Sequence, residues 1–208
     1  MTPSVEACVE QFVAPDHLFT RSEVLARPCP VPASPGVYGW WFRTVPGPID
    51  VSSCVTTPEG ITLLYTGISP KPPPQNGRPP SRQSLRLRIR THYTGNAEGS
   101  TLRKTLGSLL SADLGLELRR VGSGKRMTFV HGERDLSAWM AQHALVAWVA
   151  HPTPWEVEDH LIANLDVPLN LHGNAHNRFH SELTDARRRA KAGALDLPVV
   201  PNPGTGGR

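Results

Sequence analysis

Two short stretches decide the fold of this chain: Gly36-Val37-Tyr38-Gly39-Trp40-Trp41-Phe42 and Ile61-Thr62-Leu63-Leu64-Tyr65-Thr66-Gly67-Ile68. Both are rich in aromatic and β-branched residues, which favour strands, and a connection that contains Pro, Gly and Ser separates them. We therefore expect two neighbouring antiparallel strands. On such a pair, Tyr38 and Tyr65 can project from the same face of the sheet and bring two phenol oxygens close together.

A proline-rich segment and two helices are expected after the second strand. Prolines recur in residues 69–82, and each removes an amide donor and restricts the residue before it, so this segment is predicted to be a loop. From Ser84 the apolar residues recur among arginines at helical spacing, which predicts an amphipathic helix that ends near Gly95. A second helix is expected to begin at Ser100.

The remaining elements complete an α/β (α+β) domain. Residues 116–120 and 126–130 flank a Val-Gly-Ser-Gly turn signal, which predicts an additional hairpin. Residues 136–143 and 155–165 have helical spacing, whereas residues 145–149 have strand character. The sequence thus predicts a small, mainly antiparallel three-stranded sheet flanked by helices.

A length of 208 residues suits one domain with extensions at its ends. We expect an N-terminal arm at residues 1–34, with a short helix that the capping-box pattern Thr20-Arg21-Ser22-Glu23 opens. The compact domain is expected at residues 35–172. A helical extension at residues 173–192 and a disordered tail at residues 193–208, which is rich in Pro and Gly, should follow.

Charge and cysteine usage restrict the class of protein. The net charge of +4 permits a polyanionic partner without requiring one. The three cysteines, Cys8, Cys29 and Cys54, form no CxxC pair, so neither a disulfide framework nor a zinc ribbon is implied, and a reducing, cytoplasmic setting is expected. No apolar run has the length of a membrane span, and the first residues do not resemble an export signal, so no membrane partner is expected.

One group of separated residues suggests phosphodiester hydrolysis. This reaction needs a base for water, cations for the charge on phosphorus, and stabilisation of the leaving oxygen. A tyrosine, an arginine and a metal held by a carboxylate can supply these functions. Arg88 and His92 lie four residues apart and so share one face of the predicted helix, while Glu158 lies on a later helix where one carboxylate with waters would suit Mg²⁺.

These residues occur in a recognisable order. Gly36-Val37-Tyr38 followed by Tyr65-Thr66-Gly67 resembles the paired GIY and YIG strands of the GIY-YIG nuclease superfamily. Residues 88–92 resemble its arginine-to-histidine helix, residues 158–162 resemble its metal-binding glutamate segment, and Asn170 falls where the family often has a late asparagine. The resemblance spans residues 35–172. Valine and threonine replace the isoleucines of the two motif names, and both suit strands.

The resemblance implies a hydrolase that cuts one strand of DNA with one divalent cation, Mg²⁺ or Mn²⁺. Tyr38 would be the general base, Tyr65 would position water or phosphate, Arg88 would neutralise the phosphoryl oxygens, and Glu158 would hold the metal. The full set of expected catalytic residues is Tyr38, Tyr65, Arg88, His92, Glu158 and Asn170. A GIY-YIG-like nucleic-acid-binding module that does not cut, and an RNA-directed nuclease, are the alternatives.

Basic residues concentrate around the predicted arginine helix, with only Glu98 among them. They are Arg78, Arg82, Arg86, Arg88, Arg90, Arg103 and Lys104. Of these we expect Arg86, Arg90, Arg103 and Lys104 to contact nucleic acid, although a solvated helix face explains any one of them equally well. Because the sequence shows no appended DNA-binding domain, we expect either low intrinsic specificity or a protein partner that supplies it.

Three histidines, His172, His176 and His180, recur every four residues and raise the alternative of a zinc site. Gly173 and the Asn-rich context argue against the continuous helix that this spacing would need. The five tryptophans lie in periodic apolar segments, which favours core packing over base stacking.

Overall fold

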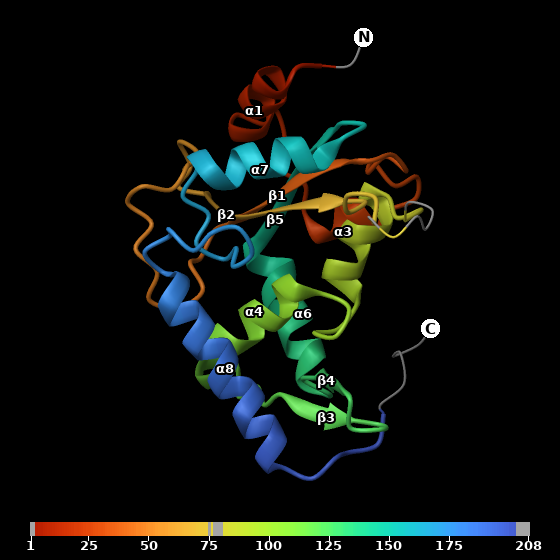
Figure 1. Ribbon diagram of the computed structural model, residues 1–208, viewed down its shortest axis with the longest axis vertical. Coiled ribbons are helices and arrows are strands. Elements are labelled where there is room, and N and C mark those ends of the chain that lie inside the picture. The colour runs from red at the N-terminus through yellow and green to blue at the C-terminus, as the bar shows by residue number, and fades with distance from the viewer. Residues whose placement is uncertain (1–2, 75, 77–80, 203–208) are drawn as a thin grey trace.

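The computed structural model describes residues 3–74, 76 and 81–202, and its centre is a three-stranded antiparallel sheet covered by helices on both faces (Figure 1). The strands are β1 (Gly36–Phe42), β2 (Thr62–Ser69) and β5 (Ala144–Ala150), in the order β2-β1-β5. This arrangement confirms the predicted fold class.

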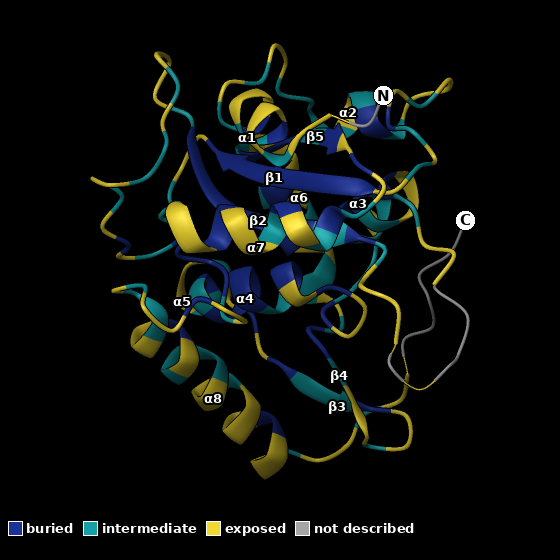
Figure 2. Cartoon of the chain, turned by 45° about the horizontal axis from the view of Figure 1, so that its top comes forward, coloured by how far each residue is buried: buried dark blue, intermediate teal, exposed yellow. Residues whose placement is uncertain are grey.

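The central strand β1 is buried along its whole length, as Figure 2 shows. Two features of the sequence allow this strand to be buried on both faces. Its side chains alternate between the two faces, with Val37 and Trp41 on one and Tyr38 and Trp40 on the other. At Gly39 a Cβ atom would lie 2.8 Å from Cζ of Phe12, so only glycine lets this aromatic ring pack against the strand.

Helices α1 (Val5–Val13) and α7 (Pro154–Asn164) cover one face of the sheet. Helix α1 lies in the segment that was expected to be an arm with a short helix at Thr20, and it was not predicted. Its N-cap is Ser4, whose hydroxyl accepts a hydrogen bond from the N–H of Ala7 at 3.2 Å. The buried residues of this layer are Cys8, Phe12, Val37, Trp41, Leu63, Leu145, Val149, Val157, Leu161, Ile162 and Val167.

The other face carries the larger core. Helices α3 (Leu85–Thr94) and α6 (Gly132–His143) pack on this face. Helices α2 (Arg21–Leu25), α4 (Thr101–Leu109) and α5 (Ser111–Leu114) pack against them. The capping box expected at Thr20 and Glu23 is confirmed. Ser84 and Ser100, where the sequence predicted that two helices begin, are the N-caps of α3 and α4. The proline-rich segment was expected from residue 69, but Ser69 still belongs to β2, and the other described residues of the segment contain neither helix nor strand. Residues 75 and 77–80 lie outside the described residues.

The predicted hairpin is present as β3 (Arg119–Val121) and β4 (Arg126–Thr128), which form a separate two-stranded sheet. Helix α8 (His180–Asp196) runs beside α4 towards this hairpin (Figure 1). Across the helices found in the described residues, none is long and apolar enough to cross a bilayer.

The expectation of disorder from residue 193 is wrong for the segment that the structure describes. Helix α8 continues to Asp196, and Val200 pairs in parallel with Val121 beside the hairpin. The physical reason is Arg120, whose guanidinium donates hydrogen bonds to carbonyl oxygens at the end of α8 and so satisfies groups that a helix terminus leaves unpaired. Residues 203–208 lie outside the described residues. The domain limits at residues 34 and 172 stay predictions.

Candidate active site

The two motif tyrosines lie on the same face of the sheet, because of the register between β1 and β2. Tyr38 is opposite Gly67, and Trp40 is opposite Tyr65, so the tyrosines are diagonal neighbours rather than a direct pair. Both rings face His92, whose ring centroid is 5.4 Å from that of Tyr38 and 6.4 Å from that of Tyr65.

Gly67 makes room for the phenol of Tyr38. A Cβ atom on residue 67 would lie 2.6 Å from the hydroxyl oxygen and 2.8 Å from Cζ of Tyr38. Any side chain here would push the tyrosine ring off the strand face. The glycine of the second motif is therefore a steric requirement of the tyrosine of the first.

Helix α3 brings a cation and an imidazole to the Tyr38 hydroxyl. Arg88 Nε donates a hydrogen bond to Tyr38 Oη at 3.4 Å, and His92 Nε2 lies 2.8 Å from the same oxygen. A terminal nitrogen of Arg88 also donates to the carbonyl of Gly99 at 2.8 Å, which fixes the guanidinium on the site side of the helix. The spacing of four residues predicted this shared face correctly.

The second ring nitrogen of His92 contacts a residue that the sequence marked only as the start of a helix. Nδ1 of His92 lies 2.6 Å from the hydroxyl oxygen of Ser100. Burial lowers the pKa of His92 well below its usual value, and the charges of Arg88 and Arg103 act in the same direction. His92 is therefore neutral at physiological pH. Serine at a helix start carries no signal of such a contact, which only the packing of α3 against α4 creates.

The tyrosines are enclosed, and their ionisation is correspondingly unfavourable. Burial raises the pKa of Tyr38 far above its usual value, and the neighbouring Tyr65 adds to this effect. Burial raises the pKa of Tyr65 to about 12. The positive charge of Arg88 opposes both shifts, so this arginine is the group that most favours a phenolate at either position.

Glu158 lies on α7, and its environment differs from that of the acidic residues beside it. Glu156 and Asp159 are exposed, whereas Glu158 is partly buried. Burial raises the pKa of Glu158 to about 7, the charge of Asp159 raises it further, and Lys71 opposes the shift. Glu158 also raises the pKa of both tyrosines, so its carboxylate belongs to the same electrostatic cluster.

The donor set suits a metal that needs few protein ligands. Within the described ranges, no three His, Cys, Asp or Glu side chains gather as a metal cluster, so His172, His176 and His180 do not form the zinc site considered above. Glu158 offers one carboxylate, which accepts no hydrogen bond from any described residue and is free to hold a cation. Mg²⁺ binds through one or two carboxylates, waters and substrate phosphates, so this site fits it.

Asn170 supports the site from behind rather than facing it. Its Oδ1 accepts a hydrogen bond from the N–H of Thr66 at 2.9 Å, and its Nδ2 donates to the Thr66 carbonyl at 2.9 Å. The side chain thereby pairs with the free edge of β2 between Tyr65 and Gly67. Both polar ends are occupied by backbone, so Asn170 is placed to fix the strand and is not directed at a substrate.

One of the expected nucleic-acid contacts is wrong. Arg103 is completely buried, and its guanidinium is bound to Glu133 Oε2 at 2.7 Å and to the carbonyl oxygens of Glu133 and His92. A phosphate cannot reach it. The ion pair forms because α4 packs against α6, a tertiary contact that the clustering of basic residues in sequence did not predict.

The other expected contacts remain accessible to different degrees. Arg86 is exposed, while Arg90 and Lys104 are partly buried. Nε of Arg86 donates a hydrogen bond to the carbonyl of Val31 at 2.7 Å, which leaves its terminal nitrogens at the surface. Arg78 lies outside the described residues.

Helix α8 supplies a cation that the sequence analysis missed. Arg187 is partly buried, its charge lowers the pKa of Tyr65, and its own pKa is lowered by burial. The basic end of this helix was recognisable in the sequence. No pattern in the sequence indicated that one of its arginines lies near Tyr65 in the folded chain.

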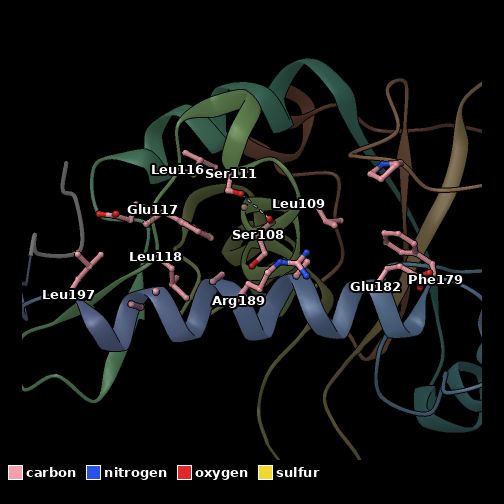
Figure 3. A pocket seen from close by; sticks show the side chains of 17 residues that line it. Ser108, Leu109, Ser111, Leu116, Glu117, Leu118, Phe179, Glu182, Arg189 and Leu197 are labelled. Atoms are coloured by element: carbon pink, nitrogen blue, oxygen red, sulfur yellow. Dashed lines mark hydrogen bonds between the residues drawn. The ribbon is translucent and has the colours of Figure 1, made fainter.

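The cavity beneath α8 is a separate feature. It has a volume of about 620 Å³ and lies between α8 and the α4–α5 region (Figure 3). Leucine and alanine side chains form much of its wall, and Glu182 and Arg189 contribute charge from α8. None of the expected catalytic residues lines it, so we do not assign the chemistry to this cavity.

Comparison with known proteins agrees with the geometry. A family model for the GIY-YIG catalytic domain matches residues 36–189, which includes both motif strands, α3, α7 and most of α8. Searches of curated proteins and of solved structures give no match. Because the matched segment covers well over half of the 208 residues, the chain belongs to the GIY-YIG catalytic domain family, and its function is of the nuclease type.

Proposed function

We propose that this protein is a divalent-metal-dependent endonuclease that hydrolyses phosphodiester bonds of DNA. The observation that carries the proposal is the hydrogen-bonded group of Tyr38, Arg88 and His92, beside Tyr65 and a partly buried Glu158. A tyrosine, a fixed cation and a carboxylate that accepts no hydrogen bond from a described residue are suited to phosphodiester hydrolysis.

Tyr38 is the proposed general base. In its ionised form it would take a proton from the water that attacks phosphorus, while the bond from phosphorus to the leaving sugar oxygen breaks. Burial opposes ionisation of Tyr38, and Arg88 favours it, so the arginine makes this role accessible. Tyr65, held on the same face, would position the water or the phosphate.

The positive charges are placed where negative charge develops. Arg88 would neutralise the charge of the phosphoryl oxygens on the α3 side, and Arg187 would add a second positive charge near Tyr65. Glu158 would hold Mg²⁺ or Mn²⁺, which when bound supplies Lewis-acid stabilisation of the phosphoryl and leaving oxygens. Asn170 and Gly67 would act through the strand by keeping both tyrosines in place.

DNA is the proposed substrate class, and Arg86, Arg90 and Lys104 are its proposed contacts outside the reacting centre. We also propose a cytoplasmic location, consistent with three cysteines that form no disulfide, and a protein partner that supplies sequence specificity. RNA cleavage remains the alternative substrate class for the same chemistry.

A binding module that does not cut is the competing function, and the enclosure of Tyr38, which is only 1% exposed, favours it. The test is cleavage of plasmid, linear duplex, single-stranded DNA and RNA with Mg²⁺ or Mn²⁺. Wild type should cut DNA, Glu158→Gln should not, and Asp159→Asn should retain activity because Asp159 is exposed. If wild-type protein binds nucleic acid but cuts none of these substrates with either metal, the binding module replaces the nuclease.

A further inference from the structure

His92 makes one hydrogen bond through each ring nitrogen. Nε2 lies 2.8 Å from Tyr38 Oη, and Nδ1 lies 2.6 Å from Ser100 Oγ. The imidazole is fully buried between two arginine charges and is neutral, so one nitrogen must donate while the other accepts. Only two arrangements of the protons satisfy these distances, and they give Tyr38 opposite roles.

Each arrangement leaves one buried hydroxyl proton without an acceptor among the described residues, either that of Ser100 or that of Tyr38. Ser100 is the N-cap of α4, and its hydroxyl oxygen accepts the N–H of Arg103 at 3.1 Å. The hydroxyl proton needs an acceptor of its own, because Ser100 is fully buried. Among the residues that the structure describes, the acceptor within reach of Ser100 Oγ is Nδ1 of His92. If Nδ1 carried the proton instead, the serine proton would be left unpaired.

We propose that Ser100 is a positioning residue that donates its hydroxyl proton to Nδ1 of His92 and thereby directs the Nε2 proton at Tyr38. This inference rests on the proposed function for the role of Tyr38 as the base. Tyr38 Oη then accepts from two donors, His92 Nε2 and, at 3.4 Å, Arg88 Nε.

The arrangement matters because two donors favour the charged form of a phenol. In the opposite arrangement the phenol O–H would donate its hydrogen bond to Nε2 of His92. Arg88 would then be the one donor of this group to stabilise a phenolate.

In the proposed arrangement, the hydroxyl proton of Tyr38 is the one that lacks an acceptor among the described residues. We choose this arrangement because, under the proposed function, the reacting water or phosphate lies beside Tyr38 Oη and can accept that proton, whereas no reactant is proposed beside Ser100. The hydroxyl proton of Tyr38 is also the proton that must leave before Tyr38 can act as a base.

The test is a direct measurement of the tautomer by NMR in protein with ¹⁵N-labelled histidine. Long-range ¹H–¹⁵N correlations separate a protonated ring nitrogen from an unprotonated one, and the His92→Gln variant assigns the signals. We expect Nδ1 of His92 to be unprotonated in wild type. In Ser100→Ala the Nδ1 signal should move towards the protonated value, and Ser100→Thr, which keeps the hydroxyl, should restore it.

Ser84→Ala is the matched control for loss of a helix cap. Ser84 caps α3 through the N–H of Leu87 as Ser100 caps α4, but it does not contact the imidazole. Ser84→Ala should therefore leave the tautomer of His92 unchanged. Cleavage should fall about tenfold in Ser100→Ala, as expected for the loss of one hydrogen bond in the transition state.

A wild-type His92 protonated at Nδ1, or a tautomer that Ser100→Ala does not alter, overturns the inference. The wild-type measurement decides it even if Ser100→Ala does not fold. The NMR measurement does not depend on cleavage, so an inactive protein with the expected tautomer would refute the nuclease and leave the inference standing.

Discussion

Replacing Glu158 with glutamine should abolish cleavage and stabilise the metal-free protein. The structure raises the pKa of Glu158 from 4.5 to about 7, chiefly through burial. Below pH 4.5 the carboxyl group is protonated in the folded and the unfolded chain, so it makes no difference to stability. Between pH 4.5 and about 7 the unfolded chain loses the proton first, and stability falls as pH rises.

The magnitude follows from this pH interval. A pKa difference of one is worth about 1.4 kcal/mol, so the ionised carboxylate should destabilise the fold by on the order of 3 kcal/mol at pH 8. Glu158→Gln removes the charge and should raise the free energy of unfolding by about 2 to 3 kcal/mol at pH 8, and by almost nothing at pH 4. For a domain of this size, the melting temperature should rise by roughly 5 to 10 °C.

Urea denaturation without metal, at pH 4 and pH 8, measures the effect. Glu156→Gln is the matched control, because it removes an exposed carboxylate from the same helix and should change stability by less than about 0.5 kcal/mol. Adding Mg²⁺ should stabilise wild type but not Glu158→Gln, since a cation that binds only the folded state stabilises it. A gain of equal size at both pH values would refute the reasoning, because an effect of lost charge must disappear where the carboxyl is already neutral.

Three further changes test two parts of the site and one ion pair of the core. Gly67→Ala should leave the chain folded but displace the Tyr38 ring, because the new Cβ would lie 2.6 Å from Tyr38 Oη. Cleavage should then fall at least tenfold, and normal cleavage would contradict the steric argument. Arg187→Ala should slow single-turnover cleavage about tenfold or more, whereas Arg188→Ala, which removes an exposed surface ion pair, should not; equal rates would remove Arg187 from the site. Glu133→Ala should lower the free energy of unfolding by about 3 to 5 kcal/mol, measured by urea denaturation, because it leaves a buried guanidinium unpaired; a change below about 1 kcal/mol would contradict this.

The sequence predicted the parts of the fold that local periodicity determines. The aromatic and β-branched runs around Tyr38 and Tyr65 gave β1 and β2, and the serines before α3 and α4 marked both helix starts. Helix α1 was missed because its short amphipathic pattern gains stability from packing Phe12 against Gly39, a contact that is distant in sequence.

The candidate site divides in the same way. Arg88 and His92 were placed on one face because helical spacing is a local property. Arg103 was misplaced because charge density along a sequence does not distinguish a solvated cation from one that pairs with Glu133 across two helices. Arg187 was missed for the converse reason, since only the return of α8 brings it near Tyr65.

The groups proposed for the chemistry are also those whose environment disfavours their charged forms. Glu158 is held where its charge is disfavoured, His92 is buried between two positive charges, and Tyr38 is enclosed where it ionises with difficulty. A sequence selected for stability alone would place a neutral or apolar side chain at the position of Glu158. Here the perturbed groups act on one another, because Glu158 on α7 raises the pKa of both tyrosines and His92 on α3 contacts Tyr38 Oη. Because strained and perturbed groups persist where function requires them, this mutual perturbation is a physical argument for the site that does not depend on the motif.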